Sequence, residues 1–169
     1  MNTAAPHDDI EACCPGDYEK IASIYNEYIT LGGATMEERV YDAAMIAKWV
    51  SAFNQREKLY VLRKDGAVIG WGILKRYSDR EGYRFACETA IYITASELRK
   101  GYGSRMKVFL IEQCKSFGYK HLVAKIFASN TSSIEYNLSL GYTIVGRQEK
   151  IGFRNDQWQD IVIMQYLID

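Results

Sequence analysis

Apolar positions recur along the chain with two spacings, which predicts helices and strands in a definite order. Spacings of three and four residues, typical of helices with one buried face, occur in residues 15–30, 43–55, 103–117 and 130–141. Alternating or continuous apolar runs, typical of strands, occur in residues 9–14, 58–64, 67–77, 83–94, 121–128, 142–150 and 160–168. The order β-α-α-β-β-β-α-β-α-β-β predicts an α/β (α+β) fold in which helices flank a mixed central sheet. The length of 169 residues fits one domain over residues 1–169.

Turn and cap residues separate these elements. The dipeptide Asp65-Gly66 lies between two apolar runs and predicts a tight β-hairpin. Asp42 and Asn130 each precede a helical pattern, where a side-chain oxygen can accept from a free backbone N–H. Gly118 follows the third helix and is expected to end it.

Charge and hydropathy narrow the classes of partner. Lys plus Arg and Asp plus Glu both number 21, so the formal net charge is zero, whereas nucleic-acid binding usually needs a basic excess. No uncharged run approaches the roughly 18 residues of a membrane helix. Residues 1–14 also lack the basic and then apolar order of a signal peptide. We therefore expect a cytoplasmic protein with neither a nucleic acid nor a membrane as partner.

The four cysteines indicate free thiols in a reducing compartment. Adjacent cysteines such as Cys13 and Cys14 seldom pair with each other, and no Cys/His spacing suggests zinc. The two histidines, His7 and His121, lie far apart in the chain. We expect no bound metal.

The segment 96–104, SELRKGYGS, is the first candidate for chemistry. Between a predicted strand and a predicted helix it carries Arg99, Lys100, Gly101, Gly103 and Ser104. Backbone N–H groups at a helix start are unpaired and the helix dipole favours anions, so this loop can bind phosphate. Neither a P-loop nor a complete G-x-G-x-x-G is present, and taken alone the loop is more often a polar surface turn than a phosphate site.

Glu88 is the second candidate, because it lies within the apolar run 83–94. A carboxylate among apolar residues is costly unless it is paired or reaches a solvated cleft. Glu88 therefore indicates either a functional site in a cleft or a strand with one solvent-exposed face.

Together these features resemble the GNAT acetyltransferase superfamily over about residues 9–167. The coenzyme A loop of that family, Q/R-x-x-G-x-G/A, matches residues 98–103, LRKGYG. A second marker, an Asn followed eleven residues later by Gly and an aromatic residue, matches Asn130, Gly141 and Tyr142.

The chain is more closely similar to the phosphinothricin N-acetyltransferase group. Its strand motif matches residues 88–93, ETAIYI, and its Arg-x-x-Tyr matches Arg80 and Tyr83. Near the C-terminus an aromatic-basic pair matches residues 153–154 and Trp-x-Asp matches residues 158–160.

The resemblance implies transfer of an acetyl group from acetyl-CoA to the primary amine of a small amino-acid-like acceptor. Glu88 is implied as the general base, and Arg80 and Tyr83 as acceptor-binding residues; a homodimer is implied as well. The implied acetyl-CoA contacts are Ile91 and Ile93 through their backbone, Arg99, Lys100, Gly101, Tyr102, Gly103 and Ser104 around the pyrophosphate, and Asn130 and Ser133 beside the pantetheine arm.

The chain departs from the family pattern at several positions. Leu98 replaces the usual Gln or Arg of the loop, and Asn137 stands where many members have a Tyr that protonates the leaving thiolate. Tyr136 should project about 100° away from Asn137 on the helix. Gln159 stands where the phosphinothricin enzymes have His, and Met36 stands where an aromatic residue is expected. Both positions are expected to affect the acceptor pocket.

Two alternatives stay open at this level. In the first alternative, the acceptor amine is a protein N-terminus, a lysine or a polyamine. In the second, the chain binds coenzyme A without turnover. An acidic, open cleft would favour a protein or polyamine acceptor, whereas Arg80, Arg84 and Arg154 favour an acidic one.

Overall fold

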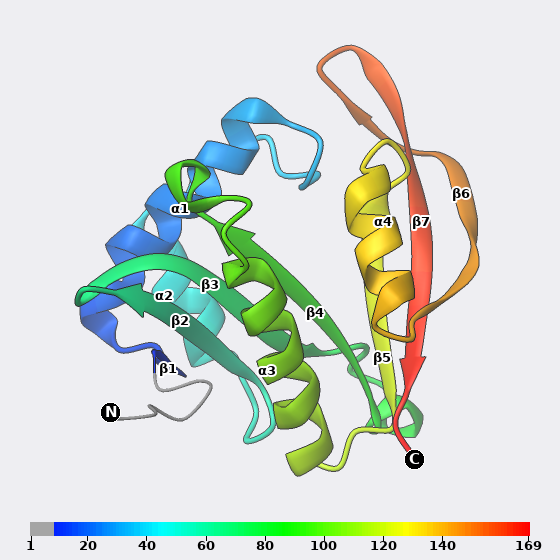
Figure 1. The fold of residues 1–169 in the computed structure, drawn as a ribbon, viewed down its shortest axis with the longest axis horizontal. Helices are drawn as coiled ribbons and strands as arrows, with labels where there is room; N and C mark the ends of the chain where they lie inside the picture. Colours follow the sequence, from blue (N-terminus) through cyan, green and yellow to red (C-terminus); the bar gives the residue numbers. More distant parts are fainter. Residues whose placement is uncertain (1–8) are drawn as a thin grey trace.

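The computed structural model describes residues 9–169, so His7 and the start of the domain expected over residues 1–169 lie outside the described residues. The strands are β1 (Ile10–Ala12), β2 (Lys58–Lys64), β3 (Ala67–Arg76), β4 (Ala86–Ile93), β5 (His121–Phe127), β6 (Thr143–Arg154) and β7 (Gln157–Leu167). The helices are α1 (Tyr18–Leu31), α2 (Ala43–Ser51), α3 (Tyr102–Ser116) and α4 (Thr131–Ser139), with 3-10 turns at Pro15–Asp17, Glu81–Tyr83 and Ala95–Glu97. The predicted element order and fold class are confirmed (Figure 1).

Local chemistry accounts for the element ends. The Asp42 side chain accepts from Met45 N at 2.9 Å at the start of α2, and the Asn130 side chain caps α4. Asp65 and Gly66 both have positive φ, 50° and 80°, as a tight hairpin between β2 and β3 requires.

The seven strands form one mixed sheet in the order β1-β2-β3-β4-β5-β7-β6. Every neighbouring pair is antiparallel except β4 and β5, which run parallel. These two strands pair over only three positions, the last being Glu88 with Val123, and then diverge as Figure 1 shows. The sheet therefore opens at its centre.

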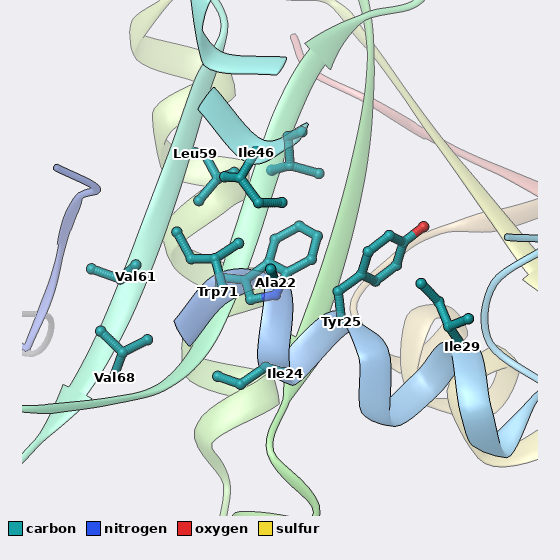
Figure 2. Packing of buried hydrophobic residues seen from close by; sticks show 11 residues of the cluster. Ala22, Ile24, Tyr25, Ile29, Ile46, Leu59, Val61, Val68 and Trp71 are labelled. Carbon is teal, nitrogen blue, oxygen red and sulfur yellow. The ribbon is translucent and has the colours of Figure 1, made fainter. Parts of the chain in front are cut away.

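Helices cover both faces of the sheet. On one face α1 and α2 pack against β2 and β3, where residues such as Ile24, Ile46 and Trp71 are almost fully buried (Figure 2). On the other face α3 contributes Met106 and Leu110 to a second core, and α4 covers β5 and β7. Because successive side chains of β2 and β3 point to opposite faces, these strands contribute residues to both cores.

Several element bounds differ from the sequence prediction; α2, for example, ends at Ser51 rather than at residue 55. β6 and β7 continue beyond the predicted residues 142–150 and 160–168 into a long hairpin, whose turn residues Asn155 and Asp156 both have positive φ. Asn and Asp tolerate this conformation, so the turn signal was present. β4 begins at Ala86 rather than at residue 83, because the chain first makes the 3-10 turn Glu81–Tyr83.

Candidate active site

The centre of the site is the edge of β4 that faces the opening. Residues 89–93 have no strand partner on that side among residues 9–169. Thr94 N donates to Ile69 O of β3 at 2.8 Å, so the alternating backbone groups of Thr89, Ile91 and Ile93 point the other way, into the opening. A strand edge of this kind can pair with an extended amide-bearing ligand.

A pocket of about 580 Å³, here called the donor pocket, occupies this opening. The predicted coenzyme residues that line it are Ile91, Ile93, Arg99, Gly101, Gly103, Ser104, Asn130 and Ser133. The structure thus brings together residues from β4, the loop before α3 and the start of α4.

The loop before α3 presents its backbone to the donor pocket. Gly101 has φ +87°, a left-handed conformation, and a Cβ placed there would meet nothing within 4 Å. The N-cap residue Gly101 has no side chain to cap α3, so the first backbone N–H groups of the helix can bind an anion. These features fit the pyrophosphate of a coenzyme A ligand.

Two other loop residues face elsewhere. The Lys100 ammonium lies 3.1 Å from the Glu97 carboxylate, and Tyr102, the first residue of α3, packs against the core that contains Met106 and Leu110. Of the two predicted cationic side chains, only that of Arg99 lines the donor pocket.

Both Tyr136 and Asn137 of α4 line the donor pocket. The Tyr136 hydroxyl lies 3.4 Å from Ser104 O of α3, so it spans the two helices. Asn137 is buried, and its Oδ1 has no hydrogen-bond partner among residues 9–169. Because the side chains diverge on the helix, they occupy different parts of one pocket.

Tyr28 of α1 contacts the free edge of β4 at its C-terminal residue, Ile93. The sequence did not predict this contact. Its hydroxyl donates to Ile93 O at 2.5 Å and accepts from Ile93 N at 3.3 Å. Its ring packs edge-on against Tyr92 at 5.1 Å, and burial raises the pKa of Tyr28. The backbone groups of Ile93 are therefore already satisfied by a side chain.

Replacing Tyr28 with phenylalanine should raise acetyl-CoA affinity about fivefold, because one net hydrogen bond of about 1 kcal/mol no longer competes for Ile93. Calorimetric titration with acetyl-CoA measures this, with Tyr18→Phe on the same helix as the control. Weaker binding by Tyr28→Phe would mean that the hydroxyl contacts the ligand instead.

A second pocket, here called the acceptor pocket, lies on the α1 and α2 face and has a volume of about 490 Å³. Its wall is aromatic, formed by Tyr25, Tyr41, Trp49, Phe53, Trp71, Tyr77 and Tyr92. Tyr25 makes edge-on contacts with Trp71 at 5.5 Å and Tyr92 at 5.0 Å. The Nε1 of Trp71 is buried without a hydrogen-bond partner among residues 9–169.

Charged side chains line the acceptor pocket as well. They are Glu37, Glu57, Lys75, Arg76, Asp79 and Glu88. Arg76 pairs with both buried Glu57 and exposed Asp79. Glu88, with 19% of its side chain exposed, lies 3.4 Å from the Lys125 ammonium of β5. Lys75 stands opposite Glu88 across β3 and β4 and makes no ion pair among the described residues.

Arg80 and Tyr83 lie in the exposed segment beside this pocket. Tyr83 packs edge-on against the pocket residue Tyr77 at 5.4 Å. Arg84 stacks on Phe85 at 4.7 Å, and buried Arg154 donates to Thr35 O at 2.7 Å. Arg80, Arg84 and Arg154, the arginines that favoured an acidic acceptor in the sequence analysis, are therefore not among the residues that line the acceptor pocket.

The donor and acceptor pockets share Ala90 and Tyr92 of β4. Glu88 is two residues from Ala90 on the acceptor side, at the last pair of β4 with β5. The two pockets therefore adjoin at Ala90 and Tyr92, with Glu88 on the acceptor side.

Comparison with known proteins agrees with this arrangement. The model of the acetyltransferase (GNAT) domain family matches residues 10–163, so the chain belongs to that family and is an N-acetyltransferase. The predicted resemblance is confirmed.

Its similarity to particular relatives is moderate. It is 28% identical over 151 residues to phosphinothricin N-acetyltransferase of Alcaligenes faecalis, covering 88% of this chain and 77% of that protein. It is 27% identical over 157 residues to the L-methionine sulfoximine/L-methionine sulfone acetyltransferase of Salmonella typhimurium, covering 90% of each. The structure of a phosphinothricin acetyltransferase of Sinorhizobium meliloti in complex with acetyl-CoA has a TM-score of 0.89 at 28% identity, covering 94% of this chain and 87% of that chain.

Two further features of the described residues concern metal binding and membranes. Within residues 9–169, no three His, Cys, Asp or Glu side chains are grouped to hold a metal ion. None of the helices in that part of the chain is long and apolar enough to cross a membrane.

Proposed function

We propose that this enzyme transfers the acetyl group of acetyl-CoA to the primary amine of a small amino-acid-like acceptor, with Glu88 as general base. The observation that carries the proposal is the meeting of two pockets at β4, with the Glu88 carboxylate lining the acceptor side. An acceptor ammonium must lose a proton before its nitrogen can attack a thioester. Glu88 is the carboxylate at the junction, so it takes that proton directly or through water.

Positioning supplies the rest of catalysis. Backbone groups of Ile91 and Ile93 pair with the pantetheine arm, as a strand would, once Tyr28 releases Ile93. The N–H groups at the start of α3, with Gly101, Gly103, Arg99 and Ser104, hold the pyrophosphate. Lys100 and Tyr102 support this loop from outside the pocket, and Asn130 and Ser133 border the pantetheine.

The acceptor pocket suits a zwitterion with a compact polar side chain. Its aromatic wall favours an ammonium group by cation–π attraction, and Lys75 supplies a cation for a carboxylate. The names of the two relatives above support the same substrate class, and Arg80 and Tyr83 at the pocket entrance stay predicted acceptor contacts.

A turnover screen tests the acceptor. Thiol release from acetyl-CoA is measured with phosphinothricin, methionine sulfone, methionine sulfoximine, the common amino acids, polyamines and a peptide N-terminus. We expect the highest kcat/KM with the first three. Turnover confined to polyamines or the peptide, or coenzyme A binding without turnover on the whole panel, would contradict the proposal.

Assembly as a homodimer, cytoplasmic location and a single domain over residues 1–169 stay predictions. Exposed apolar side chains on β6 and β7, including Ile151, Phe153 and Trp158, support an association surface. A monomer in sedimentation equilibrium would contradict the homodimer.

A further inference from the structure

Lys107 is a buried cation that the mechanism above does not use. It lies on α3 with only 6% of its surface exposed, and it lines the donor pocket. Its Nζ lies 3.3 Å from Thr89 Oγ1 and 4.4 Å from the centre of the Tyr142 ring. It makes no ion pair with a carboxylate in residues 9–169. An ammonium has three N–H donors, so most of its capacity is unused.

Burial makes such a residue expensive. A charged group removed from water costs free energy unless it is paired, and Lys rarely lies at a buried position without a reason. The titratable groups that face it are Cys87 of β4, Cys114 of α3 and Tyr142 after α4. Burial lowers the pKa of Lys107 to about 8, and the two thiols offset only part of that effect.

Lys107 lies on the donor side of the place where the two pockets meet. Its contact Thr89 lies between Glu88 and Ala90, and Ala90 belongs to both pockets. Successive side chains of a strand point to opposite faces, so Thr89 and Lys107 lie on the α3 face while Glu88 lies on the α1 and α2 face. The unpartnered Oδ1 of Asn137 lines the same pocket, which is a second sign that a ligand completes this region.

We propose that Lys107 is the group that protonates the coenzyme A sulfur when the thioester breaks. This rests on the proposed function, in which the acyl carbon lies at the junction. The acceptor ammonium first loses one proton to water by way of Glu88. The neutral nitrogen then forms the new C–N bond on the Glu88 side and loses a second proton to Glu88. The C–S bond breaks toward the α3 face, its electron pair goes to sulfur, and the Lys107 ammonium gives sulfur a proton. Glu88 returns its proton to water and Lys107 takes one up, so of the two protons that nitrogen loses, one is replaced on sulfur and one is released.

The proton affinities are well matched for this transfer. An ordinary thiol has a pKa of about 8.5, close to that of the buried Lys107, so proton transfer between them is nearly balanced. A lysine in water would hold its proton far more tightly. This assignment also supplies a proton donor where Asn137 cannot act as one.

Lys107→Met is the test variant, since methionine fills a similar volume without the charge. We expect kcat to fall by about tenfold to a hundredfold with little change in KM for acetyl-CoA, because an acid acts only when the bond breaks. An acid must be protonated, so the wild type should lose kcat as the pH rises through the alkaline range, and the variant should lack this decline. Lys115→Met, at an exposed site on the same helix, is the matched control and should match the wild type.

A binding measurement separates this proposal from the choice of acceptor, because it needs no amine. Calorimetric titration with coenzyme A in two buffers of different ionisation enthalpy counts the protons released. Near pH 8 we expect release with the wild type, as the bound thiol ionises beside the ammonium, and less with Lys107→Met. Desulfo-coenzyme A should show no difference between the two proteins.

Equal proton release by both proteins, or an unchanged kcat and pH profile in Lys107→Met, would overturn the proposal. Should Lys107→Met fail to fold in thermal unfolding, Lys107→Arg serves instead. It keeps the positive charge but does not give up its proton, so kcat should fall while coenzyme A binding still releases protons. Full activity of Lys107→Arg would equally count against a proton donor at this position.

Discussion

Replacing Glu88 with glutamine is expected to lower kcat/KM for acetyl transfer by about a thousandfold, while acetyl-CoA binds with nearly unchanged affinity. Glutamine keeps the size of the side chain but cannot accept a proton from the acceptor ammonium. Glu88 lines the acceptor pocket and not the donor pocket, so its loss should leave coenzyme binding intact. Initial rates and calorimetric titration with acetyl-CoA measure the two effects separately.

The control for Glu88→Gln is Glu19→Gln, which removes an exposed carboxylate of α1 that lines neither pocket. A fully active Glu88→Gln enzyme would show that another group takes the proton. Because the Lys125 ammonium lies 3.4 Å from Glu88, thermal unfolding of both variants should accompany the kinetics, to separate loss of the base from loss of the pair.

Substituting valine for Gly101 is expected to weaken acetyl-CoA binding by about a hundredfold. Gly101 has φ +87°, where a β-branched residue is strained, so the loop must change its backbone conformation. The N–H groups at the start of α3 then no longer point toward the pyrophosphate, and charge-assisted hydrogen bonds of about 1.5–3 kcal/mol each are weakened. Equilibrium titration with acetyl-CoA measures the loss.

Gly118 at the other end of α3 offers a matched control. It has φ +79° and also has open space around its Cβ position, so Gly118→Val brings the same strain away from the donor pocket. That variant should lose stability but keep acetyl-CoA affinity. Gly103→Val should weaken binding by filling the pocket, whereas Lys100→Ala should cost less, since Lys100 faces Glu97. Equal losses from Gly101→Val, Gly118→Val and Lys100→Ala would contradict a backbone cradle.

Much of the fold could be predicted because it depends on local physics. The helix caps Asp42 and Asn130, the Asp65-Gly66 hairpin and the apolar stripes are each determined by residues close together in the chain. The loop before α3 was predictable for the same reason, since its glycines and the helix start are consecutive.

Residues that act across the chain were harder to predict. Tyr28 meets Ile93 across 65 positions, and Lys125 meets Glu88 from a parallel strand. Lys107 did leave a signal, because it is spaced three and seven residues from Leu110 and Cys114 and so shares the buried stripe of α3. Arg80 and Tyr83 were predicted from a motif of neighbouring residues. In the structure they lie beside the acceptor pocket and are not among the residues that line it.

The sequence by itself determined the order of elements, the caps and turns, the family and the position of the glycine-containing loop before α3, since periodicity and short motifs are properties of neighbouring residues. Only the tertiary structure decided that β4 and β5 part after Glu88, that the donor and acceptor pockets meet there, and that Lys107 and Glu88 lie on opposite faces of that meeting point. The physical reason is that a sheet joins segments distant in the chain. Pairing, twist and packing, rather than any local preference, set where its strands separate.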